Sequence, residues 1–176
     1  MIVEFDGYCP QVSPGAFVAP TAVLVGNVIV AEDASIWYGA VLRADHGAQG
    51  IVVGPRSSVQ DCCVIHVARD RGTTIGADVT VGHGAILEGC DIEDGALIGM
   101  NSVVLESARV GSRALLAANS TVLAHTRIPP ETLAAGSPAV VKKRISGSAL
   151  GWIDGSAAYY VDLARRYRDQ GLGHSE

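Results

Sequence analysis

The side chains best suited to metal chemistry lie close together in the middle of the chain. His66, His83 and Glu88 all fall within the stretch from Ile65 to Glu88. Two histidines and one glutamate form a ligand set that catalytic zinc sites use. If the chain holds a metal, this stretch is where we expect it. Whether the three side chains can meet depends on the elements that carry them.

A repeat of six residues runs through this part of the chain. From Ile75 onward an aliphatic residue opens each unit, and a small or β-branched residue follows four positions later in all but one shortened unit. An amphipathic helix repeats its apolar positions at about 3.6 residues and a half-buried strand at 2. The period of six fits neither of these and favours a coil with three flat sides, each placing one aliphatic residue in a narrow core. The opening residues are Ile75, Val81, Leu87, Ile92, Ile98, Val104, Val110, Leu116 and Val122.

This pattern resembles the hexapeptide-repeat left-handed parallel β-helix, in which each repeat rests on its neighbours. The composition agrees, with 5% aromatic residues, 18% charged residues and 21 glycines. The resemblance implies an all-β solenoid. We expect a single domain over residues 1–176, with the β-helix over 17–128, an extended return segment over 129–150 and a C-terminal α-helix over 151–171. Pro129 and Pro130 are expected to end the coil because they cannot donate backbone hydrogen bonds.

The expected C-terminal helix has an apolar stripe that should pack on the coil. The stripe consists of Ile153, Ala157, Tyr160, Val161, Ala164 and Tyr167. Residues 1–16 contain neither a basic leader nor a long apolar run, which predicts a cytoplasmic protein with no membrane span. The net charge of −5 and the lack of a basic stripe argue against nucleic acid as a partner. The four cysteines, Cys9, Cys62, Cys63 and Cys90, lack C-x-x-C spacing and are expected to be buried thiols.

The repeat also predicts which polar residues stack. Leu42, Ile65 and Leu87 open units three sides apart, so the residues after them should lie above one another on successive coils, about 4.8 Å apart. Those residues are Arg43, His66 and Glu88. The same count puts His83 in a different column, with Tyr38, Asp61 and Met100, and therefore on another side of the coil. A symmetric oligomer could bring the His83 of a neighbour to the His66 face.

Four short motifs narrow the resemblance to γ-class carbonic anhydrases. They are VLRAD with Arg43 and Asp45, VQD with Gln60 and Asp61, IHV with His66, and VGHGAIL with His83. The resemblance implies a homotrimer that hydrates carbon dioxide to bicarbonate. It also implies a zinc ion, with iron or cobalt as alternatives, at each subunit boundary, held by His66, His83 and residue 88. The catalytic candidates are Arg43, Asp45, Gln60 and Asp61, which match positions that join subunits and surround the substrate.

Residue 88 departs from the family pattern. The family would read VGHGAILHGC, whereas this chain reads VGHGAILEGC. Glu88 can complete a zinc site, but an anionic ligand should make the bound water less acidic than three neutral histidines do, and should weaken hydration. In the alternative interpretation Glu88 forms an ion pair within the Arg43–His66 column and leaves the metal site empty or weakly occupied.

Other functions stay open at this point. Hexapeptide solenoids include acyl-CoA thioesterases and acyltransferases, and relatives of the anhydrases include inactive assembly subunits. Three further histidines lie outside the predicted metal site. His46, next to Asp45, is a candidate proton-transfer group because its reference pKa is about 6.5. His125 is expected to be an exposed corner residue, and His174 is given no role.

Overall fold

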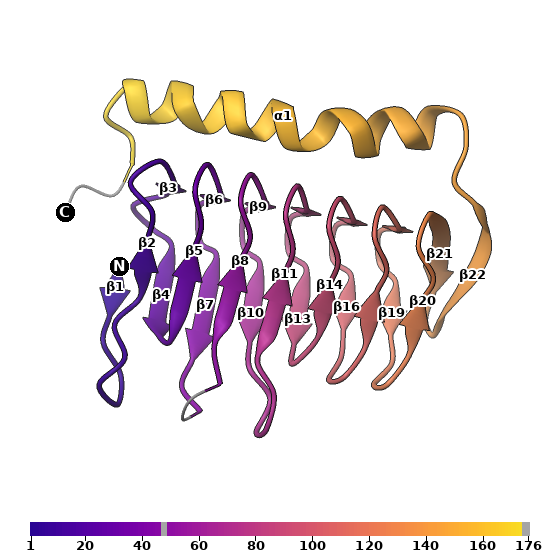
Figure 1. Cartoon of the computed structure of the whole chain (residues 1–176), viewed down its shortest axis with the longest axis horizontal. Helices are drawn as coiled ribbons and strands as arrows, with labels where there is room; N and C mark the ends of the chain where they lie inside the picture. Colours follow the sequence, from indigo (N-terminus) through magenta and orange to yellow (C-terminus); the bar gives the residue numbers. More distant parts are fainter. Residues whose placement is uncertain (47–48, 174–176) are drawn as a thin grey trace.

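The computed structural model describes residues 1–46 and 49–173, which form a left-handed parallel β-helix with one α-helix along its side (Figure 1). Three sheets make the three sides of the coil. In the first sheet the strands are β1 (Ile2–Val3), β4 (Val23–Gly26), β7 (Val41–Ala44), β10 (Val64–His66), β13 (Ile86–Glu88), β16 (Val103–Val104) and β19 (Thr121–Val122).

The other two sheets follow the same order along the solenoid. The second contains β2 (Gln11–Val12), β5 (Val28–Val30), β8 (Ile51–Val53), β11 (Thr73–Ile75), β14 (Asp91–Ile92), β17 (Arg109–Val110) and β20 (Arg127–Ile128). The third contains β3 (Phe17–Val18), β6 (Ser35–Ile36), β9 (Ser58–Val59), β12 (Thr80–Val81), β15 (Leu97–Ile98), β18 (Leu115–Leu116), β21 (Thr132–Gly136) and β22 (Ala139–Arg144). All described pairs are parallel except β21 with β22.

The aliphatic residue of each repeat points into the axis of the coil. Leu42, Ile65 and Leu87 are fully buried and lie in register on β7, β10 and β13. Because alternate residues of a strand face opposite sides, the residue after each of them faces outward. The small residues near the corners, such as Ala40 and Ala85, are also buried. The period of six therefore predicted the core correctly.

Helix α1 (Ser148–Asp169) lies over the third sheet and runs back toward the first coils (Figure 1). It buries Ile153, Ala157, Val161 and Ala164, as the apolar stripe predicted. The ring of Tyr167 lies 5.7 Å from that of Phe17 and 5.2 Å from that of Trp37. The helix begins at Ser148, before the expected residue 151, and ends at Asp169, before 171.

Both ends of the coil differ from the expected boundaries. The coil begins with β1 and β2, before residue 17, because these strands pair with β4 and β5. It also continues past Pro129 and Pro130, since β21 pairs in parallel with β18. The prolines are tolerated because β20 is the last strand of its sheet. The residues that follow it have no further coil to which a backbone N–H could donate, so the N–H that proline lacks is not needed. Residues 129–150 are therefore not a return segment: β22 folds back on β21, and α1 makes the return.

The expectation of four buried cysteines was half wrong. Cys63 and Cys90 are buried, and desolvation raises the pKa of each thiol to about 12. Cys9 and Cys62 are exposed. Cys62 occupies a corner with a φ of 59°, where the chain turns between two sides. Among the described residues, no helix combines the length and the apolar character needed to cross a membrane.

Candidate metal site

Three adjacent strands carry the first group of polar residues. Arg43, His66 and Glu88 are paired in register on β7, β10 and β13. Each follows a buried aliphatic residue and so projects from the outer face of the first sheet. This column is the one that the repeat predicted.

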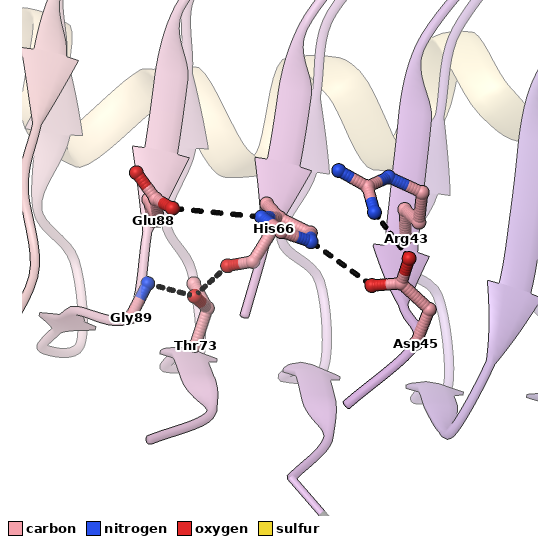
Figure 2. A network of polar contacts seen from close by, with 6 residues as sticks. All are labelled: Arg43, Asp45, His66, Thr73, Glu88 and Gly89. Carbon is pink, nitrogen blue, oxygen red and sulfur yellow. Dashed lines mark hydrogen bonds and ion pairs between the residues drawn. The ribbon is translucent and has the colours of Figure 1, made fainter. Parts of the chain in front are cut away.

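His66 lies between two carboxylates (Figure 2). Its Nε2 is 3.0 Å from Oδ1 of Asp45, and its Nδ1 is 3.6 Å from Oε1 of Glu88. Asp45 also pairs with Arg43 through its other oxygen. A carboxylate only accepts hydrogen bonds, so Asp45 fixes the proton of His66 on Nε2. In the neutral imidazole, the Nδ1 lone pair is then turned toward Glu88.

Asp45 is well suited to hold His66 in this orientation. Desolvation raises the pKa of the Asp45 carboxyl, but hydrogen bonds with His66 and Arg43 and the charge of Arg43 outweigh it. The pKa of Asp45 consequently lies below its ordinary value. The group stays ionised at neutral pH and keeps accepting from His66.

Thr73 connects the backbones of the two strands that carry His66 and Glu88. Its hydroxyl donates to the carbonyl oxygen of His66 and accepts a 2.8 Å hydrogen bond from the N–H of Gly89 (Figure 2). Thr73 is fully buried at the start of β11. It links the ends of β10 and β13, and no motif or repeat position in the sequence pointed to this role.

The second group of residues surrounds His83, just after β12 in the third sheet. Nδ1 of His83 lies 2.9 Å from Oδ2 of Asp61. The buried Gln60 accepts a 3.1 Å hydrogen bond from the His83 backbone N–H through its Oε1. Asp61 favours the proton on Nδ1, which leaves the Nε2 lone pair of His83 available to a ligand. Gln60 thus positions the backbone of His83.

Within one subunit the two groups remain apart. Over residues 1–46 and 49–173, no three His, Cys, Asp or Glu side chains lie together in a way that could hold a metal ion. His83 follows a strand of the third sheet, whereas His66 and Glu88 belong to the first. A site that uses all three requires a second copy of the chain.

The geometry fits such a shared site. Nδ1 of His66 and Oε1 of Glu88 are two acceptors facing each other at 3.6 Å, beyond the usual hydrogen-bond distance. A cation would satisfy both acceptors. It could be a proton on Nδ1 of His66 or a metal bound between the two atoms. Two ligands of one tetrahedral zinc, with bonds of about 2.0–2.2 Å, lie about 3.4 Å apart. Both histidines also show the carboxylate–histidine arrangement that orients metal ligands, through Asp45 and Asp61.

The other histidines lie outside this arrangement. The His46 ring is 6.4 Å from the His66 ring, and its role in proton transfer stays a prediction. His125 is exposed at a corner with a φ of 61°, as expected. His174 lies outside the described residues.

Comparisons with known proteins agree with the motifs. A family model for the hexapeptide repeat of succinyl-transferase matches residues 72–106 and 90–124. The Carnitine operon protein CaiE of Salmonella choleraesuis is 41% identical over 93% of this chain and 82% of that protein. Gamma carbonic anhydrase 2, mitochondrial, of Arabidopsis thaliana is 38% identical over 89% of this chain and 58% of its own length. The chain belongs to the γ-class carbonic anhydrase-like family of hexapeptide-repeat proteins.

The family fold extends over nearly the whole chain. The crystal structure of the product of the Bacillus cereus BC4754 gene matches with a TM-score of 0.94 and 35% identity, covering 97% of this chain and 98% of that one. The agreement includes the coil that carries the candidate ligands. That protein is described as a putative acetyltransferase, whereas the Arabidopsis relative is named a carbonic anhydrase, so the activity depends on the residues of the site.

Proposed function

We propose that the chain forms a homotrimer that reversibly hydrates carbon dioxide to bicarbonate at a metal site on each subunit boundary. His66 and Glu88 of one subunit and His83 of the next would hold the metal, with zinc as the first candidate and iron or cobalt as alternatives. The observation that carries the proposal is the distance of 3.6 Å between two acceptors that face each other, Nδ1 of His66 and Oε1 of Glu88. Bound zinc would act as a Lewis acid and make hydroxide available near neutral pH.

The remaining residues have defined tasks in this proposal. Asp45 and Asp61 fix the tautomers of His66 and His83, and Gln60 anchors the backbone of His83. Arg43 is about half exposed beside the pair and is held by Asp45. Its planar guanidinium suits a flat anion such as bicarbonate, since it can donate two parallel hydrogen bonds.

Glu88 distinguishes this chain from an anhydrase with three histidine ligands. Its side chain is 46% exposed, so water screens its charge only in part. An anionic ligand reduces the net positive charge of the site, which disfavours ionisation of water there. We therefore propose an activity that is weaker at neutral pH than three imidazoles would support.

Metal reconstitution tests the proposal directly. The protein is purified without chelator, its metal content is determined, and hydration of carbon dioxide is followed by stopped flow. Removal of the metal should abolish hydration, and addition of zinc, Fe²⁺ or Co²⁺ should restore it. A trimer that binds none of these ions and shows no hydration would overturn the proposal. A thioesterase, an acyltransferase or an assembly subunit would then be the better interpretation.

A further inference from the structure

A large cavity, lined in part by His83, lies away from the His66–Glu88 pair. It has a volume of about 720 Å³ and separates the third sheet from the N-terminal part of α1. Small-molecule sites usually measure about 300–1,000 Å³ and are mostly apolar. Leu97, Leu115 and Leu133 line its sheet side, and Trp152 and Tyr159 line its helix side.

The sheet side of the cavity follows the stacked strands of the coil. Leu97, Leu115 and Leu133 are in register on β15, β18 and β21, and Thr80 of β12 is the next residue in this column. Neighbouring strands lie about 4.8 Å apart, so these four strands give the groove a length of about 14 Å. An occupant would lie parallel to the solenoid axis.

The helix side of the groove leaves space that this chain does not fill. Gly151 and Gly155 line the groove, and a Cβ atom added to either would meet no atom within 4 Å. Trp152 and Tyr159, seven residues apart and so on one side of the helix, are 67% and 60% exposed. These aromatic rings are available to cover an apolar ligand.

One end of the groove offers an imidazole and an amide to a ligand. His83 and Gln60 lie at that end, whereas the hydroxyls of Thr80 and Ser156 bond each other at 2.7 Å. Among the described lining residues there is no Lys, Arg, Asp or Glu. The groove is therefore unsuited to a polyanion. It suits a molecule with a linear apolar body and a single polar end.

We infer that this groove binds a linear acyl chain of medium length, with its polar end at His83. This goes beyond the proposed function, because carbon dioxide has no apolar body to fill such a groove. The ligand would lie against the column of leucines, and Trp152 and Tyr159 would cover it. Its polar end would lie next to a candidate metal ligand.

Quenching of tryptophan fluorescence by acrylamide tests this inference on the full chain. The two tryptophans differ strongly in exposure, since Trp37 is 4% exposed and Trp152 is 67% exposed. Trp152 therefore reports on the groove. Sodium decanoate should reduce the quenching of Trp152 at least twofold, and sodium butyrate, with its short chain, should not. The measurement is made on metal-free and metal-loaded protein, so its outcome is independent of hydration activity.

Two helix variants show where decanoate binds. Gly155→Leu fills the groove and should weaken decanoate binding at least tenfold. Ala158→Leu adds the same side chain at an exposed position of α1 that does not line the groove, and should leave binding unchanged. Equal binding by both variants, or no effect of decanoate on the parent, would overturn the inference. The inference would also be overturned if Trp152 were protected from acrylamide without decanoate and became quenched when the protein was diluted to monomer. That result would show that a second copy of the chain fills the groove.

Discussion

Nδ1 of His66 lies 3.6 Å from Oε1 of Glu88, the residue paired with it on the next coil. Strand pairing and the Thr73 hydroxyl fix the backbones of both residues. Their separation is therefore a property of the scaffold and does not require a metal to draw the side chains together. His66 and Glu88 can form an ion pair, or they can be two of the three protein ligands of a metal. Substitutions of the candidate ligands and of their neighbours distinguish the two cases.

Removal of either histidine should abolish stoichiometric metal binding. His66→Ala and His83→Ala should each lose zinc but keep the circular dichroism spectrum of the β-helix, because neither side chain belongs to the buried core. His125→Ala, at an exposed corner, is the control and should retain the parent's metal content. Metal content that is unchanged in both variants would reject these ligands.

Mixed trimers should recover part of the lost metal. Light scattering at micromolar concentration should first show a trimer, and a monomeric mass would exclude the shared site. Subunits carrying His66→Ala and His83→Ala are then unfolded, mixed and refolded together. If each site takes His66 from one subunit and His83 from the next, random assembly restores about a quarter of the sites. If all ligands came from one chain, mixing would restore none.

Replacement of Glu88 by histidine should increase hydration near pH 7. Glu88→His replaces an anionic ligand by a neutral one, so the pKa of water at the metal should fall toward about 7. At a pH below the pKa of this water, lowering the pKa by one unit increases the fraction present as hydroxide about tenfold. Glu88→Gln is the control, because it removes the charge without supplying an imidazole and should lose metal. A zinc-loaded Glu88→His trimer that is no faster than the parent in stopped flow would contradict the proposal that Glu88 weakens carbon dioxide hydration.

Asp45→Asn should weaken metal binding because an amide can donate to Nε2 of His66 and so favour the wrong tautomer. Loss of such a supporting carboxylate typically costs about 10–100-fold in metal affinity. Asp70→Asn, in the exposed loop after β10, is the matched control. Equal zinc affinity of the two variants in a competition titration would remove Asp45 from this role.

The lowered pKa of Asp45 also makes a prediction for stability without metal. The stabilisation is fully present above the unfolded-state pKa of about 3.9 and is lost as pH falls through the lower folded-state value. The parent should therefore be more stable than Asp45→Asn at pH 7, and the difference should shrink toward pH 2. Denaturant unfolding of the metal-free proteins at both pH values measures this, and a difference that grows on acidification would contradict it.

The repeat period predicted most of the fold and the placement of one half of the candidate site. Register alone places Arg43, His66 and Glu88 in one column, since side-chain direction in a β-helix follows from position in the repeat. It could not predict that Asp45 folds back onto His66, because Asp45 lies at the start of an insertion where the register is lost. Thr73 was missed for the same reason. The first coil escaped notice because Phe5 and Tyr8 bridge within a tight turn that interrupts the six-residue spacing.

Helix α1 has a consequence for how the molecule unfolds. Stacked repeats touch only their neighbours, so a solenoid can fray from either end. Here the end of the helix reaches the first coils, where Arg165 pairs with Asp33 at 3.0 Å and Tyr167 packs on Phe17. The helix starts directly after β22, which caps the last coil. It thereby links the two ends of the stack, and loss of either end exposes the same apolar stripe. The chain should consequently unfold as one cooperative unit, in contrast to a repeat array that melts coil by coil.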